Sequence, residues 1–337
     1  MRRVTALALV ARAVACLPWS WLRVAGAMLG LLAGSLLRIR RAHVETAMRR
    51  AEVNDVPAEA RAMYASLGTA IFEFLWLAGR GAPPSDKIVV GEGARAVLAE
   101  HGRASSRDPR RPGIVVATAH TGNWDFVACA LGRDHIDLSV VTKRLSAPAL
   151  DDFWQARRAS FGVELLHGAG VFGRAVDAVE RGRAVAMLID QAPERRTAVT
   201  DLPFLGQGAR CDTTAALLAA RSGVPLVLAL GRRLRDGRHH VDVPLVLEPP
   251  PRATQQWVET ATRELNAALE RFVREEPSQW LWMHRRWKTR AQLHLSHRSA
   301  PEAMMARDDE HADAGGGSKR LLGGSGRDLA RVSARGE

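Results

Sequence analysis

His120 and Asp125 are the two residues of this chain best placed, by type and spacing, for acid–base chemistry. An apolar run at 114–117 precedes them as a short buried strand would, and a helical pattern begins at Phe126. Five steps turn an α-helix through ~500°, so the two side chains cannot share one helix face. Across a strand–turn–helix junction, however, the Asp125 carboxylate can reach back to the imidazole, fix its tautomer and support its protonated form. We therefore predict a general base, His120, oriented by Asp125; the alternative is a hydrogen-bonded structural histidine beside a capped helix.

The turn between these residues has the composition of an anion-binding site. Gly122 lets the backbone approach a substrate closely, and Asn123 is a natural N-cap. Backbone N–H groups at the start of a helix can hold a phosphate or a developing oxyanion. We expect Gly122 and Asn123 to line the substrate site.

Length, charge and cysteine content narrow the class of protein. A chain of 337 residues with 47% hydrophobic content can bury a large core, as one α/β domain with attachments. Its three cysteines are widely spaced and indicate neither a disulfide framework nor a metal site, so we expect a reducing compartment. The formal charge of +12 implies an anionic partner: nucleic acid, acidic lipid headgroups or an acidic carrier protein.

The N-terminal region is apolar but interrupted. Residues 4–37 contain Arg12, Pro18 and Arg23, and the longest uninterrupted run, 24–37, is shorter than the ~20 residues of a full membrane span. The arginines that follow are those expected at a cytoplasmic flank: Arg38, Arg40 and Arg41. We predict a membrane anchor or interfacial hairpin; the alternative is an amphipathic helix packed on the domain.

Short β runs alternate with helical patterns along most of the remaining chain. The expected strands are 88–90, 114–120, 138–141, 163–166, 184–189, 226–230 and 239–246. The expected helices are 94–100, 126–131, 149–160, 174–181, 213–221 and a long amphipathic one at 254–274. This alternation predicts an α/β fold with a mostly parallel or mixed central sheet flanked by helices.

The domain organisation follows from these patterns. We predict an anchoring segment at 1–38, a helical part at 39–84 in which Pro57 starts the second helix, and an α/β domain at 85–290. The glycine-rich polar stretch at 291–337 is predicted to be a disordered tail.

The C-terminal block of the α/β domain interleaves aromatic and basic residues. Trp280, Trp282 and Trp287 are interleaved with basic residues, a combination suited to a lipid phosphate at a membrane surface. The basic residues are Arg285, Arg286, Lys288 and Arg290. The alternatives are a packed terminal segment with a solvated basic face and a groove that stacks single-stranded nucleic acid.

These blocks together resemble the lysophospholipid and lipid A acyltransferase superfamily, whose hallmark is His, four residues, then Asp or Glu. The branch most similar to this chain includes lauroyl/myristoyl lipid A acyltransferases and mycobacterial mannoside acyltransferases. The matching blocks appear in family order: His120–Asp125, Arg158 before Gly162, Asp190-Gln191, Pro203–Gly206 and Trp280–Arg290. The resemblance covers residues 5–290, although the segment 44–51 lacks the Asn-Leu pair and the Phe-Pro usual in the family.

The resemblance implies a glycerolipid acyltransferase-like fold and an O-acyltransferase on the cytoplasmic face of a bacterial inner membrane. The implied donor is acyl-acyl carrier protein (acyl-ACP) or acyl-CoA. The implied acceptor is a hydroxyl of a glycolipid, such as a lipid A precursor, or of a lysophospholipid, with no metal, cofactor or nucleic acid involved. Besides His120 and Asp125, the implied substrate-binding or oxyanion residues are Gly122, Asn123, Arg158, Asp190, Gln191, Phe204, Gly206, Arg285 and Arg286.

Two other functions compete with this one. Residues 168–173 match G-x-G-x-x-G after an expected strand, and Asp190 follows about twenty residues on, as in a dinucleotide-binding oxidoreductase. A basic, membrane-associated lipid-binding protein without chemistry is the other alternative. His239 and His240 are expected in an exposed edge hairpin with no third metal ligand nearby.

Overall fold

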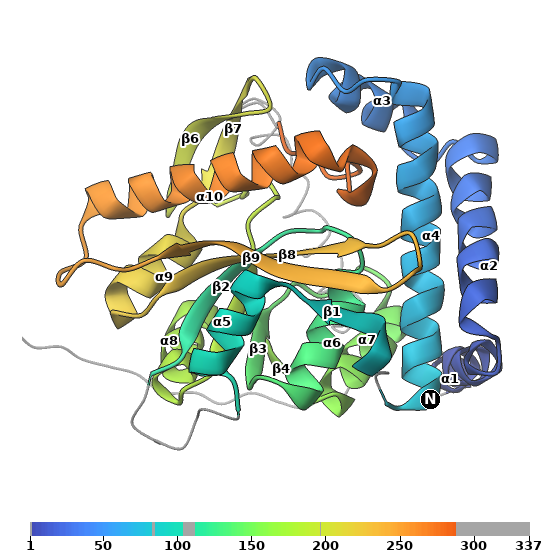
Figure 1. Ribbon diagram of the computed structural model, residues 1–337, viewed down its shortest axis with the longest axis horizontal. Helices are drawn as coiled ribbons and strands as arrows, with labels where there is room; N and C mark the ends of the chain where they lie inside the picture. The colour runs from blue at the N-terminus through green and yellow to red at the C-terminus, as the bar shows by residue number, and fades with distance from the viewer. Residues whose placement is uncertain (1, 83–84, 104–111, 196, 288–337) are drawn as a thin grey trace, which may run out of the picture. The chain divides into compact units, whose positions relative to one another are not determined.

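The central sheet has seven strands, in the order β1-β9-β8-β2-β5-β3-β4 (Figure 1). The computed structural model describes residues 2–82, 85–103, 112–195 and 197–287, and the predicted tail at 291–337 lies outside these ranges. The strands of this sheet are β1 (Ile88–Val90), β2 (Ile114–Thr118), β3 (Leu138–Val141), β4 (Glu164–Leu166), β5 (Ala184–Leu188), β8 (Leu226–Arg233) and β9 (His239–Leu247). All their pairings are parallel except that of β8 with β9. The predicted mostly parallel α/β fold is therefore confirmed.

The two faces of this sheet are covered by different helices. These helices are α5 (Glu92–His101), α6 (Trp124–Asp134), α7 (Pro148–Ser160), α8 (Val171–Glu180), α9 (Thr214–Ser222) and α10 (Gln255–Glu275). Along β2, Val115 and Ala117 pack into one core with α8, α9 and α10, whereas Ile114 and Val116 pack toward α5 and α6. Successive strand residues point to opposite faces, so a strand covered on both sides has a continuous apolar sequence.

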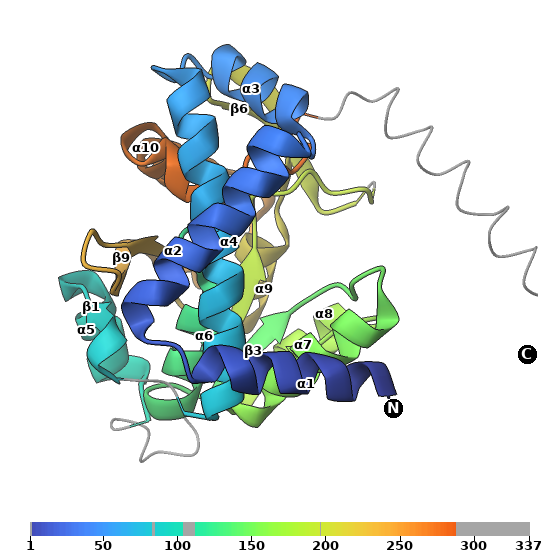
Figure 2. The same cartoon turned by 90° about the vertical axis from the view of Figure 1, so that its right-hand side faces the viewer.

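The N-terminal region forms a separate helical layer. It consists of α1 (Arg2–Ala15), α2 (Trp19–Leu31), the π-helical turn η1 (Leu32–Leu36), α3 (Arg41–Arg50) and α4 (Val56–Arg80), with the 3-10 turn η2 (Ser85–Lys87) leading into β1. Pro57 lies in the first turn of α4, as predicted. Helices α2 and α4 lie side by side (Figures 1 and 2). Their backbones approach closely because a Cβ at Gly26, Gly30 or Gly68 would overlap the facing helix.

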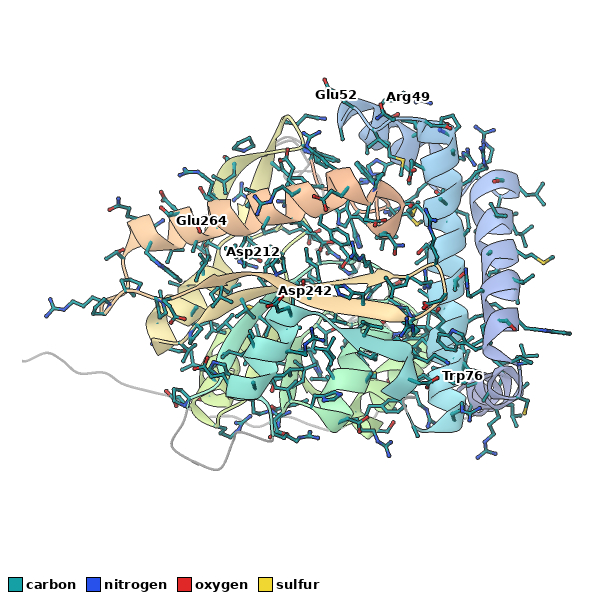
Figure 3. The ribbon with its side chains drawn as sticks, in the orientation of Figure 1. Arg49, Glu52, Trp76, Asp212, Asp242 and Glu264 are labelled. Carbon is teal, nitrogen blue, oxygen red and sulfur yellow. The ribbon has the colours of Figure 1, made fainter. Side chains whose placement is uncertain are left out.

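Helix α4 is long and apolar enough to cross a membrane, but more than half of its most apolar window is buried inside the protein. Trp76, labelled in Figure 3, lies on α4 where it meets α1. Its indole N–H donates to the Leu17 carbonyl at 3.1 Å, and its ring meets Trp19 edge-on at 5.0 Å. These contacts explain the hydrophobicity of α4 by packing within the protein.

The prediction that His239 and His240 lie in an exposed hairpin at the edge of the sheet is wrong. Strand β9 lies inside the sheet, between β1 and β8, and His239 is fully buried. The reason is a long-range pairing: β1, far away in the sequence, covers the edge that β9 would otherwise expose.

Candidate active site

His120 follows β2 at the carboxyl edge of the sheet and is held by Asp190, which follows β5. The Nδ1 atom of His120 lies 2.9 Å from Asp190 Oδ1, and the His120 backbone N–H donates to Asp190 Oδ2 at 2.8 Å. The Trp280 indole N–H donates to the same Oδ2 at 3.0 Å. Strands β2 and β5 are neighbours and parallel, so the residues that follow them meet at one edge. Because Nδ1 donates its proton to the carboxylate, Nε2 is left as the nitrogen that can accept one.

Asp125 does not orient His120, so this part of the sequence prediction is wrong. The Arg158 guanidinium contacts Asp125 Oδ1 at 2.6 Å, and the Trp154 indole N–H donates to Oδ2 at 2.8 Å. Asp125 lies in the first turn of α6, and from there its side chain reaches α7 rather than the strand end. Arg158, expected to bind substrate, therefore forms an ion pair with Asp125 inside the protein.

Each residue of the Asp-Gln motif contacts a histidine. While Asp190 binds His120, the Gln191 side-chain amide lies 3.3 Å from His284 Nε2. The His284 and His120 rings are 4.4 Å apart, centre to centre. His284 was not among the predicted site residues. Its place could not be read from its motif alone because the motif joins the site only through the loop after α10.

Burial and charge set the protonation of this group. Burial raises the pKa of the fully buried Asp190 carboxyl, but the neighbouring His120 outweighs it and holds the pKa well below its usual range. Burial lowers the pKa of His284 to about 4, and the proximity of His120 adds to this effect. At neutral pH, Asp190 is therefore charged and His284 is neutral beside His120.

The turn amides predicted to hold an oxyanion are already used within the protein. The Gly122 N–H donates to the Gln279 carbonyl at 2.8 Å, and the Thr121 N–H donates to the Ala119 carbonyl at 2.8 Å. Gly122 is required for another reason: its φ is +55°, and a Cβ would press on the Gly231 carbonyl at 2.9 Å. The engaged Gly122 amide contradicts its predicted oxyanion role, and the close approach of the Gly122 backbone to a substrate stays a prediction.

Asn123 caps α6, as its type indicates, and joins the active-site turn to a buried ion cluster. Its Oδ1 accepts from the Phe126 N–H at 3.1 Å, and its Nδ2 donates to Glu73 on α4 at 2.8 Å. Glu73 also pairs with Arg233 at 2.7 Å and lies 3.2 Å from Nε2 of His239. With both ends engaged, the Asn123 side chain positions the turn, and its contact with substrate stays a prediction.

Phe204 and Gly206 belong to a hairpin that the sequence analysis did not predict. Strands β6 (Val199–Phe204) and β7 (Gln207–Asp212) pair antiparallel through a two-residue turn. Leu205 and Gly206 both have positive φ, 50° and 73°, as this tight turn requires. Phe204 is fully buried and packs edge-on against Trp280 at 5.7 Å. Phe204 therefore stabilises the core and Gly206 the hairpin turn, and their contact with substrate stays a prediction.

The C-terminal block is part of the core rather than a lipid-facing surface. It follows α10 and the short turn η3 (Pro277–Gln279). Arg286 is fully buried: one Nη donates to the Arg210 carbonyl at 2.9 Å and the other to Asn266 at 2.6 Å. Its guanidinium also lies over the Phe204 ring at 4.9 Å. Its predicted role in phosphate binding is therefore wrong; Arg285, which is exposed, keeps that role as a prediction.

An apolar cavity of about 150 Å³ begins beside His120 and runs under α6. Ala119 and Thr121, on either side of His120, line it together with Asp125 and Arg158. From there its lining follows the strands toward their amino ends, with these side chains: Ile114, Val116, Leu138, Ala184 and Ala186. The distance from Thr118 to Ile114 is four strand steps, or about 13 Å. The lining of the cavity is thus polar near Thr121, Asp125 and Arg158, next in sequence to His120, and apolar along a length that matches a medium acyl chain.

The G-x-G-x-x-G match at 168–173 lacks the geometry of a dinucleotide site. In that fingerprint the later glycines allow close backbone approach and helix–strand packing, yet a Cβ on Gly173 would meet nothing within 4 Å. Asp190, which would bind the ribose, is occupied by His120 and Trp280. The motif forms the turn between β4 and α8.

Comparison with known proteins identifies the family of this chain. A family model described as bacterial lipid A biosynthesis acyltransferase matches residues 3–289. The chain belongs to this family. A lipid A biosynthesis lauroyltransferase of Escherichia coli (strain K12) is 30% identical over 115 residues, which are 34% of this chain and 37% of that protein. This match thus spans little more than a third of the curated relative.

A solved structure is also similar. The crystal structure of the 1-acyl-sn-glycerophosphate (LPA) acyltransferase PlsC from Thermotoga maritima covers 76% of this chain and 97% of its own, with 10% identity and a TM-score of 0.34. In this chain the His120–Asp125 block and the Trp280–Arg290 block are in contact. The Leu281 N–H donates to the His120 carbonyl at 3.0 Å.

Proposed function

We propose that this protein is a membrane-associated O-acyltransferase that moves a fatty acyl chain from a thioester donor to a hydroxyl of a lipid. The observation that carries the proposal is an imidazole held by a buried carboxylate, beside residues that line an apolar cavity: Ala119, Thr121 and Trp124. A base positioned next to a chain-sized apolar cavity suits a reaction between a hydroxyl and a long-chain thioester.

His120 acts as the general base in this reaction. Its Nε2 takes the proton of the acceptor hydroxyl as the oxygen attacks the thioester carbonyl. The carbon–sulfur bond then breaks, and the departing thiolate receives the proton back from His120. Asp190 fixes the tautomer that makes Nε2 the acceptor and stabilises the imidazolium that forms between the two proton transfers.

The acyl chain of the donor occupies the cavity under α6. The thioester lies at the polar end of the cavity, beside Thr121, Asp125 and Arg158. The hydrocarbon extends from there toward Ile114 and Ala184. Burial of the chain against apolar side chains supplies binding free energy, about 0.8 kcal/mol for each methylene removed from water. The donor is acyl-ACP or acyl-CoA, and the acceptor is a glycolipid, such as a lipid A precursor, or a lysophospholipid, in line with the family.

The N-terminal helices supply the membrane contact. On α2, Leu22, Gly26 and Gly30 are buried. The exposed apolar side chains of α2 and η1 recur at helical spacing: Trp21, Val24, Met28, Leu31, Leu32 and Leu36. An amphipathic helix with a broad exposed apolar face and flanking arginines lies in the interface of an anionic bilayer. We place this face in the cytoplasmic leaflet of a bacterial inner membrane.

Replacing His120 by alanine tests the reaction. The expected result is loss of acyl transfer, by at least about a hundredfold, because general base catalysis typically contributes that much or more. The measurement is single-turnover transfer of a labelled acyl chain from acyl-ACP and acyl-CoA, with protein that still floats with vesicles. Full transfer by His120→Ala would refute the mechanism. A wild-type protein that binds lipid but leaves the thioester intact would instead be a binding protein.

Filling the cavity is expected to change the preferred chain length. Ala186 lies midway along β5 on the cavity side, so Ala186→Leu shortens the space available to the chain. We expect the ratio of kcat/KM for decanoyl over myristoyl donor to rise about tenfold or more, since methylene-scale misfits in apolar pockets have effects of this size. Competition between the two donors in one reaction measures this ratio.

The matched control is Val185→Leu, which adds volume at the neighbouring residue on the opposite face of the same strand. Overpacking at either position costs about 1–3 kcal/mol of stability, so both variants are compared at a temperature where they are folded. An equal change of chain preference in the two variants would show that the cavity does not hold the acyl chain.

A further inference from the structure

The segment 36–43 joins the membrane-facing helices to α3 and exposes an unusual combination of side chains. Leu36, Leu37 and Ile39 are 72%, 62% and 46% exposed, and Arg38 and Arg40, on either side of Ile39, are also exposed. The helical axis turns by 88° here, between the end of η1 and the start of α3. Such alternation of apolar and cationic side chains at a sharp bend is complementary to the headgroup region of an anionic bilayer.

This lip segment, residues 36–43, also contacts the loop that carries His284. One Nη of Arg40 donates to the Met283 carbonyl at 2.9 Å, and His43 Nε2 donates to the His284 carbonyl at 3.2 Å. The two contacts hold consecutive peptide groups of that loop. His284 in turn lies against the ring of His120, 4.4 Å away. A continuous chain of contacts therefore runs from exposed apolar side chains to the base.

The backbone of the lip segment is held in an uncommon conformation. Arg38 and Arg40 both have left-handed backbone angles, with φ of 52° and 55°. Non-glycine residues adopt this conformation rarely and keep it where surrounding contacts impose it. Here the Tyr64 hydroxyl donates to the Ile39 carbonyl between them, and Arg40 is tied to Met283. Release of either contact leaves the segment free to relax, so its order and that of the catalytic loop are linked.

We propose that the lip segment couples binding of an anionic lipid bilayer to the alignment of His284 and His120. Three apolar side chains enter the bilayer interface: Leu36, Leu37 and Ile39. Arg38 binds lipid phosphate. Arg40 and His43, once ordered by the bilayer, hold the Met283 and His284 carbonyls in place through their hydrogen bonds. The proposal rests on the acyltransferase function above. It adds that the bilayer accelerates turnover itself, beyond presenting the lipid substrate.

The test separates the bilayer from the substrate. Full-length enzyme is assayed for thiol release from decanoyl-CoA with a short-chain lysophospholipid kept below its micellar concentration. Vesicles of phosphatidylglycerol and phosphatidylcholine in equal parts, or of phosphatidylcholine alone, are then added, and flotation measures bound protein separately. The expected result is a several-fold rise in kcat with saturating anionic vesicles and little change with neutral ones. Absence of any rise for bound wild-type enzyme would overturn the coupling.

Two variants and two matched controls locate the effect. Arg40→Gln is expected to float with vesicles like wild type but to lose the stimulation, and Leu36→Ser with Leu37→Ser is expected to lose both. Met28 is an exposed apolar residue of the same helical layer, and Met28→Ser is expected to weaken flotation but to keep the stimulation at saturating vesicles. Arg12 is also exposed, and Arg12→Gln is expected to change neither flotation nor stimulation. Wild-type stimulation in Arg40→Gln would overturn the coupling. Absence of acyl transfer under every condition would instead overturn the proposed function.

Discussion

Replacing Asp190 by asparagine is expected to lower kcat for acyl transfer by about a thousand- to ten-thousand-fold. Asparagine has the same shape, so it fills the fully buried site, but its amide N–H₂ group facing Nδ1 selects the opposite imidazole tautomer. In that tautomer Nε2 carries the proton and cannot accept another one. A loss of this size accompanies the equivalent change in serine proteases. Single-turnover kinetics measure the chemical step directly, and circular dichroism confirms that the variant is folded.

Asp125→Asn is the matched control, because Asp125 is the other carboxylate of the active-site region. It contacts Arg158 and Trp154 and does not touch His120, so its substitution leaves the His120 tautomer unchanged. We expect a loss of kcat at least about tenfold smaller than that of Asp190→Asn, in line with the loss of a single charged hydrogen bond. An equal or greater loss in Asp125→Asn would contradict the assignment of Asp190 as the residue that orients the base.

Replacing Glu73 by alanine is expected to lower the free energy of unfolding by about 3–5 kcal/mol, because it leaves a buried arginine without its counter-ion. The Glu73 side chain is fully buried and that of Arg233 is 8% exposed, and they meet through two contacts of 2.7 and 2.9 Å. Urea unfolding in detergent gives the measurement. The double variant Glu73→Ala, Arg233→Met is expected to recover part of the loss, since no unpaired charge remains.

The same cluster predicts a pH dependence. Burial raises the pKa of Glu73, but Arg233 and His239 outweigh it and lower the pKa from 4.5 to about 2. A depressed pKa contributes stability that is present above the unfolded value, so it is lost as pH falls from about 4.5 toward 2. Glu73→Gln is expected to lack this part of the acid dependence. An acid-unfolding profile of Glu73→Gln that parallels wild type would contradict the ion pairing of this cluster.

Local patterns in the sequence were sufficient for the strands of the central sheet, for the helices that cover it and for the position of His120, but not for the β6–β7 hairpin. The apolar run 114–117 lies in β2, and His120 follows the end of that strand, because a strand covered on both faces is mostly apolar until it leaves the sheet. Pro57 starts α4 because its ring fits only the first turn of a helix. The family resemblance also follows from short blocks whose order along the chain is visible without any structure.

The partner of the base depended on strand order, which adjacent residues do not reveal. Asp125 is five residues from His120, yet the first turn of α6 directs it to α7; Asp190 is seventy residues away, yet β5 lies next to β2. A polar residue directly after a buried strand was a usable signal for Asp190. Which two strand ends meet, however, is decided by the packing of the whole sheet.

The sequence by itself determined that this chain forms an α/β acyltransferase-like fold with a histidine at the end of a buried strand and a basic, apolar N-terminus, because these properties reside in local periodicity and motif chemistry. The tertiary structure alone decided that Arg286 and Phe204 are core residues and that His284 lies beside the base. The physical reason is burial. In sequence, the charge of Arg286 predicts a surface position, and only the fold supplies the carbonyl and amide oxygens that allow its guanidinium to be buried.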